Sequence, residues 1–176
     1  MIHLALACRV LLAAVLLIAV GSKLSRTAFG EFVSSTGRLL PPRLTGRQRS
    51  AAVLVLTVEA ATVPALLVPA TAALGLVAAV GLLTAFTIGI GGALHRGERA
   101  PCRCFGASRT RLGPLHLARN LTLIAVGVTG LAASASAGTA HPGGAVLAVF
   151  AGIVLAALMV RLDDLAALFA PTHPRS

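Results

Sequence analysis

Five long apolar runs dominate the chain and limit what it can fold into. They lie at about residues 3–22, 51–70, 72–94, 117–137 and 144–162. Each approaches the roughly 20 residues that a helix needs to cross a bilayer. Lipid offers the backbone no hydrogen bonds, so a crossing segment must pair its own N–H and C=O groups, as a helix does. The sequence predicts an all-α protein, a polytopic transmembrane helix bundle with a four-helix core and a fifth, C-terminal helix.

The composition agrees with a membrane protein. Hydrophobic residues make up 57% of the 176 residues and charged residues only 11%, against roughly 25% charged residues in soluble domains. The net charge of +10 does not indicate a nucleic-acid-binding protein, because the arginines fall between apolar runs and no basic helix interleaved with aromatic residues occurs. We expect one domain that contacts the lipid bilayer and does not bind nucleic acid.

The basic residues predict how the chain is oriented in the membrane. Of the 15 Lys and Arg residues, all but Arg9 fall in the segments 23–50 and 95–119 or after residue 160. The turn near residue 70 and the loop 138–143 contain none. The positive-inside rule makes the basic side cytoplasmic. We therefore expect a multi-pass protein of the cell membrane with its N-terminus outside and its C-terminus in the cytoplasm.

Several features within and between the runs predict local structure. Pro64 is expected to kink the second helix, and Gly89, Gly91 and Gly92 are expected to let neighbouring helices approach the third. Residues 27–35 carry apolar side chains on one side. This segment either lies in the membrane interface or is an ordinary charged connector.

Arg9 and Glu59 are charged residues inside the first and second runs. A charge within the bilayer costs at least about 2.5–3.5 kcal/mol, so such residues usually face the bundle interior and pair. Both lie in the middle-to-outer part of their helices, which makes an ion pair between them one expectation. Alternatively, Arg9 extends to the outer headgroups, or both residues have a direct role in catalysis or transport.

Two of the three cysteines, Cys102 and Cys104, lie one residue apart in HRGERAPCRCFG at 95–106. Such a pair closes a tight disulfide ring that is easily reduced, which suits exchange better than a structural bond. The flanking Arg99 and Arg103 favour the thiolate, the nucleophilic form. A helix that begins near Pro114 would add a positive dipole. The orientation argument places this pair on the cytoplasmic side.

Other interpretations of these cysteines remain open. With His95 and His116 they could form a metal site, but the spacing matches no standard zinc pattern. They could also be inert thiols in a structural turn. Cys8 lies near the opposite end of the first run, too far away to pair with them. The sequence shows no quinone, haem or flavin signature, so no cofactor and no metal is predicted.

The stretch LLTAFTIGIGGALHRGERAPCRCFG at 82–106, which ends in Phe105 and Gly106, resembles the MauE family. These methylamine utilisation membrane proteins are grouped with DoxX-like redox-associated proteins. CRVLLAAVLLIAVGSKLSRTAFGEFV at 8–33 is a second match, and it includes Lys23. Further matching positions are Glu59, Arg119 and Asn120.

The resemblance divides the chain into residues 1–137, a MauE-like four-helix transmembrane domain, and residues 138–176, an additional transmembrane helix with a short cytoplasmic tail. Arg103 departs from the small residue that the family pattern leads us to expect, and this departure disfavours a tight disulfide.

The resemblance implies a role in maturation: MauE-like proteins are linked to the disulfide-rich small subunit of methylamine dehydrogenase and act beside a thioredoxin-like partner. The cytoplasmic position predicted for the thiols conflicts with a client that matures outside, unless the thiols take electrons from the cytoplasm, the loop enters the bundle, or the orientation is reversed. The alternatives are a non-enzymatic assembly or transport factor and a metal-binding protein. The sequence leaves open the substrate, the oligomeric state and whether the protein is an enzyme.

Overall fold

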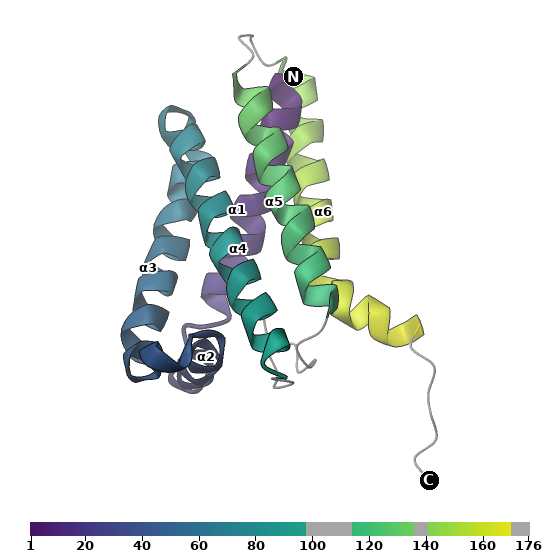
Figure 1. Cartoon of the computed structure of the whole chain (residues 1–176). Coiled ribbons are helices and arrows are strands. Elements are labelled where there is room, and N and C mark those ends of the chain that lie inside the picture. Colours follow the sequence, from purple (N-terminus) through teal and green to yellow (C-terminus); the bar gives the residue numbers. More distant parts are fainter. Residues whose placement is uncertain (98–113, 136–140, 170–176) are drawn as a thin grey trace.

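The computed structural model describes residues 1–97, 114–135 and 141–169, without the side chains of residues 42, 45, 114 and 163–169. Helices form nearly all of this part of the chain, and no strand occurs in it. Five helices are long and apolar enough to cross a membrane. They are α1 (Ile2–Gly21), α3 (Gln48–Leu67), α4 (Ala72–His95), α5 (Pro114–Ser134) and α6 (Pro142–Phe169) (Figure 1). The predicted class is confirmed: this is a multi-pass helical membrane protein.

The bounds of the first four spans agree with the apolar runs to within about three residues, but α6 is longer than its run. It continues to Phe169, although the apolar run ends near residue 162. The added residues are mostly Leu and Ala, which favour helix, and no proline follows until Pro171. The predicted end of this helix followed the end of the apolar run. The helix continues past that point because no helix-breaking residue follows.

Segment 27–35 belongs to a short helix, α2 (Arg26–Leu39), which packs against α3 and α4 and lies across their ends (Figure 1). Ser25 caps its start, because its side-chain oxygen accepts a hydrogen bond from the backbone N–H of Ala28. Leu40 is extended, as expected for a residue before proline. Two 3-10 helices follow in the chain, η1 (Pro42–Arg47) before α3 and η2 (Pro69–Thr71) in the tight turn from α3 to α4.

Four helices form a ring in which α1 packs against α3, α3 against α4, α4 against α5, and α5 against α1 (Figure 1). Helix α6 packs on the outside of this ring against α1. At one end of the bundle, α1, α4 and α6 terminate and α3 and α5 begin. We call it the basic end, because every described Lys and Arg except Arg9 lies toward it. These residues are Lys23, Arg26, Arg38, Arg43, Arg47, Arg49, Arg96, Arg119 and Arg161.

The ring closes tightly where glycines face a neighbouring helix. A Cβ on Gly127 would lie 2.6 Å from Val80 of α4, and one on Gly130 would lie 2.8 Å from Cys8 of α1. Small residues allow such close approach in membrane bundles. The expectation that Gly89, Gly91 and Gly92 have this role is wrong for Gly91, around which a Cβ would meet nothing within 4 Å. At Gly89 and Gly92 a Cβ would make only ordinary contacts, the latter with Arg96 of its own helix.

Gly75 holds α3 and α4 together next to their turn, and we predict that Gly75→Ala destabilises the protein. Its Cβ would lie 2.7 Å from the Leu66 nitrogen and 2.8 Å from the Ala65 carbonyl carbon. Backbone atoms cannot rotate away, so the two helices must separate, at an expected cost of about 1–3 kcal/mol. Thermal unfolding followed by circular dichroism in detergent measures this loss.

Gly81→Ala on the same helix is the matched control for Gly75. A Cβ there meets nothing within 4 Å, so alanine is expected to be neutral or to stabilise α4 by up to about 1 kcal/mol. Equal melting temperatures for the two alanine variants would contradict the close contact between α3 and α4.

Candidate functional site

A buried ion pair joins the end of α1 to the middle of α3. Lys23 follows α1 by two residues, and its Nζ donates to both carboxylate oxygens of Glu59, at 2.9 Å to Oε1 and 2.6 Å to Oε2. The side chains are 2% and 0% exposed. The sequence predicted Glu59 as an intramembrane polar residue but assigned Lys23 to a charged loop. The structure instead draws this lysine into the bundle.

An aromatic ring covers the ammonium group of this pair. The Lys23 Nζ lies 4.7 Å from the centre of the Phe32 ring, and Phe32 is a fully buried residue of α2. A cation over a ring face gains stability, the more so when it is desolvated. Thus α2 contributes to the site as well as covering the ends of α3 and α4.

The composition contained a signal for this lysine. The chain has 15 basic residues, and Lys23 is its only lysine. An ammonium is a compact point charge on a flexible stem, whereas a guanidinium is a planar fork with five donors. A pocket formed by one carboxylate and one ring suits the ammonium. In a chain that otherwise uses arginine throughout, the single lysine was therefore a candidate for a special position.

The first two turns of α5 add three more buried polar residues, His116, Arg119 and Asn120. His116 and Asn120 are four residues apart on one helix face, which continues into the apolar residues Leu123 and Gly127. Asn120 is 1% exposed, and neither its amide nitrogen nor its carbonyl oxygen has a hydrogen-bond partner within the described part of the chain. Its carboxamide thus offers donors and an acceptor inside the bundle.

The register of the helices places these residues at a similar depth. Helices α1 and α5 are antiparallel neighbours, with Cys8 beside Gly130 and Leu12 beside Gly127. Extending this register toward the basic end places Asn120 about level with Ala19, and His116 about level with Lys23. We call the resulting set the polar layer. It consists of Lys23, Glu59, His116, Arg119 and Asn120.

The expected pairing of Arg9 with Glu59 is wrong, because Glu59 bonds to Lys23. Arg9 instead donates from Nε to the Leu66 carbonyl at 2.7 Å and from Nη2 to the Leu67 carbonyl at 3.1 Å. Both carbonyls belong to the last turn of α3, where no helical N–H is available to bond them. Arg9 therefore caps α3 at the end opposite the basic end.

The cysteine pair Cys102 and Cys104, with Phe105 and Gly106, lies outside the described residues. The described chain shows where this segment is attached. Helix α4 ends at His95, and Gly97 follows with a positive φ of 78°, a conformation typical of a residue just past a helix end. Helix α5 begins at Pro114. Both attachment points lie at the basic end. Cys8, the third cysteine, is buried and carries a free thiol.

The two histidines considered for a metal site differ in environment. His116 is buried, whereas His95 is exposed. Within residues 1–97, 114–135 and 141–169, no group of three or more His, Cys, Asp or Glu side chains is placed to bind a metal ion. The polar layer therefore offers hydrogen bonding and fixed charge beside the basic end.

One comparison with known proteins identifies relatives of the chain. Residues 1–133 match the family described as methylamine utilisation protein MauE. The match covers α1 to α5 almost completely and ends before α6. No curated protein and no solved structure shows significant similarity to the chain.

Proposed function

Since the chain belongs to the MauE family of methylamine utilisation proteins, we propose that it is a thiol–disulfide redox or maturation factor that works with a thioredoxin-like partner. Cys102 and Cys104 are the proposed redox pair, and residues 1–137 are the proposed MauE-like domain. The observation that carries the proposal is a Cys-x-Cys-Phe-Gly sequence between α4 and α5 in a chain of this family.

The position of the attachment points supports this assignment. Gly97 and Pro114 bracket the cysteine segment at the basic end, where the polar layer occupies the ring interior. The segment itself contains four arginines and one glutamate. Positive charge near a thiol favours its thiolate, which is the attacking species in exchange. A rigid, charged end of the bundle is a suitable support for such a segment.

The proposed reaction is a two-electron exchange with the partner. One thiolate of the reduced pair attacks a sulfur of the partner's disulfide, which forms a mixed disulfide and releases one partner thiolate. The second cysteine then attacks the mixed disulfide. This step forms the bond between Cys102 and Cys104 and releases the second partner thiolate. The pair is thereby oxidised and the partner reduced, and the reverse sequence oxidises the partner.

We also propose that the basic end faces the cytoplasm, which leaves the N-terminus outside. In this orientation the thiols meet cytoplasmic electron donors, and a client that matures outside receives electrons only after transfer across the membrane. The alternative is a non-enzymatic assembly factor, in which the polar layer has a structural role and the thiols have none.

Thiol trapping in cells tests the redox proposal. Cells that express a Cys8→Ser variant are quenched with acid, and free thiols are labelled with a mass-tagged maleimide. We expect a fraction of the protein to carry no label, because its two cysteines are oxidised. That fraction should shift when the thioredoxin-like partner is deleted. Two free thiols under every growth condition would contradict the proposal and favour the assembly factor.

A membrane-impermeant maleimide tests the orientation in the same variant. In intact cells we expect no labelling of Cys102 or Cys104, and labelling only after the membrane is opened. A cysteine introduced at exposed Ala70, in the opposite turn, is the matched control and should be labelled from outside. The reverse pattern would place the thiols outside.

A further inference from the structure

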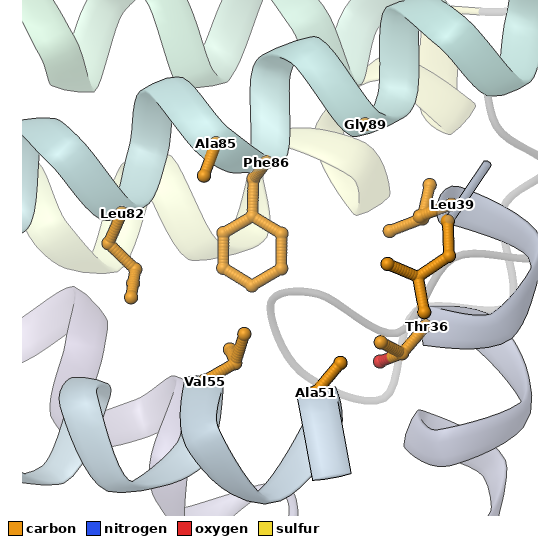
Figure 2. A pocket seen from close by; sticks show the side chains of 9 residues that line it. Thr36, Leu39, Ala51, Val55, Leu82, Ala85, Phe86 and Gly89 are labelled. Atoms are coloured by element: carbon orange, nitrogen blue, oxygen red, sulfur yellow. The ribbon is translucent and has the colours of Figure 1, made fainter. Parts of the chain in front are cut away.

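An apolar pocket opens between α2, α3 and α4, about one helical turn from Glu59 on α3 and from Phe32 on α2. It has a volume of about 180 Å3. Figure 2 shows its walls: Ala51 and Val55 from α3, Leu82, Ala85, Phe86 and Gly89 from α4, and Thr36 and Leu39 from α2. Among the described lining residues, Thr36 is the one with a polar side chain, and its hydroxyl donates to the Phe32 carbonyl at 2.8 Å.

The lining excludes water as a stable occupant. A buried water needs two to four polar partners, and an apolar cavity of about 150 Å3 stays dry and binds small hydrophobic molecules instead. Ala85 is exposed, so the pocket is accessible from the outside of the bundle between α3 and α4. In a membrane, the group that meets this opening is a lipid acyl chain.

Arginines lie at the end of the pocket nearest the basic end. Arg38 adjoins the lining residue Leu39, and Arg43 belongs to η1, which packs against α2; both arginines are exposed. Between Phe32 and Val58 the chain contains four arginines and no acidic residue. A phosphate at the membrane surface would therefore meet positive charge here with no carboxylate of this segment to oppose it.

Another arginine holds this end of the pocket in place. Arg96 at the end of α4 donates from Nη2 to the Arg38 carbonyl at 2.8 Å and to the Leu40 carbonyl at 3.4 Å. These carbonyls lie at the C-terminal end of α2, where the helix leaves them available. The bond fastens α2 to α4 on either side of the pocket, so the pocket is a fixed feature of the fold.

We propose that this pocket binds one anionic phospholipid, with an acyl chain between α3 and α4 and the phosphate on Arg38 at the end of α2 and Arg43 in η1. Arginines at a membrane surface attract anionic lipids, and each arginine raises the affinity for such a lipid by about fivefold. The proposal involves neither Cys102 nor Cys104, so it is independent of the redox assignment.

Native mass spectrometry tests the proposal on the full-length protein. The protein in mild detergent is mixed with equal amounts of phosphatidylglycerol and phosphatidylcholine that carry the same acyl chains. We expect the first bound lipid to be phosphatidylglycerol, with a preference of at least about fivefold. Arg38→Gln combined with Arg43→Gln should remove most of this preference.

Two matched controls separate the pocket from general lipid attraction. Arg26→Gln combined with Arg161→Gln removes the same charge at the basic end, but Arg26 lies about 18 Å from Arg38 along α2 and Arg161 lies on α6. This variant should keep the preference. Ala85→Phe should fill the pocket and lose the first bound lipid, whereas Ala73→Phe, at an exposed position near the opposite end of α4, should retain it.

Gly89→Leu is expected to fill the pocket from a second position. It replaces Ala85→Phe if circular dichroism shows that Ala85→Phe does not fold. Loss of the lipid in whichever folded pocket variant is obtained supports the proposal. The proposal would be overturned if the folded pocket variant retained the first lipid, or if the preference for phosphatidylglycerol survived the loss of Arg38 and Arg43.

Discussion

Replacing Glu59 by alanine is expected to lower the free energy of unfolding by about 3–5 kcal/mol, a large part of the stability of a protein of this size. The change leaves the Lys23 ammonium buried beneath Phe32 without the two carboxylate contacts at 2.6 and 2.9 Å. The chain has no Trp or Tyr, so circular dichroism in detergent is the suitable probe. A fall in melting temperature of about 10 °C is expected.

A double-mutant cycle separates the ion pair from the loss of side-chain volume. Lys23→Met combined with Glu59→Met removes both charges and keeps apolar bulk, and buried pairs replaced in this way are often neutral or more stable. The double variant should therefore melt well above Glu59→Ala. Thr57→Ala, at an exposed position on the same helix, should change little. Strictly additive losses from Lys23→Met and Glu59→Met would contradict a coupled pair.

The double Met variant also shows whether the pair has more than a structural role. If the variant is stable and active, the ion pair serves the fold alone. If it is stable and inactive, the charge inside the ring contributes to function. Asn120 lies at a similar depth, and its carboxamide has no hydrogen-bond partner among the described residues, so it would then be the next position to change.

The spans were predictable from sequence because one physical length controls them. The hydrocarbon core of a bilayer fixes how many apolar residues a helix needs, so α1, α3, α4 and α5 begin and end near the edges of their apolar runs. Prolines also indicated where helices end. Pro41 and Pro42 follow the end of α2, and Pro69 lies in the turn between α3 and α4.

The partners of the buried charges were not predictable in the same way. Depth in the membrane suggested that Arg9 and Glu59 meet, but depth does not say which helix faces are in contact. Lys23 follows the end of a span, where a basic residue normally marks orientation. Its burial depends on α2 turning back under the bundle, so that Phe32 covers the ammonium. This is a tertiary contact that no local pattern contains.

Single-cysteine variants give the sharpest chemical prediction for the pair at 102 and 104. If exchange proceeds through a mixed disulfide, the remaining thiol of Cys102→Ser or Cys104→Ser has no neighbour to release the partner. One of the two variants should therefore accumulate a covalent complex with the thioredoxin-like protein, visible on a non-reducing gel and lost on adding reductant. The Cys102→Ser/Cys104→Ser double variant should form no such complex.

The same double variant should lose all function in the maturation of the client. A hydroxyl cannot carry the two electrons that a dithiol gives up, so no residual exchange is expected from serine at either position. Cys8→Ser is the control, because Cys8 is buried on α1 beside Gly130 and serine fits its volume. That variant should keep full function. A double-serine protein that matures the client normally would instead make the family role one of assembly, with the polar layer as the structural core of the bundle.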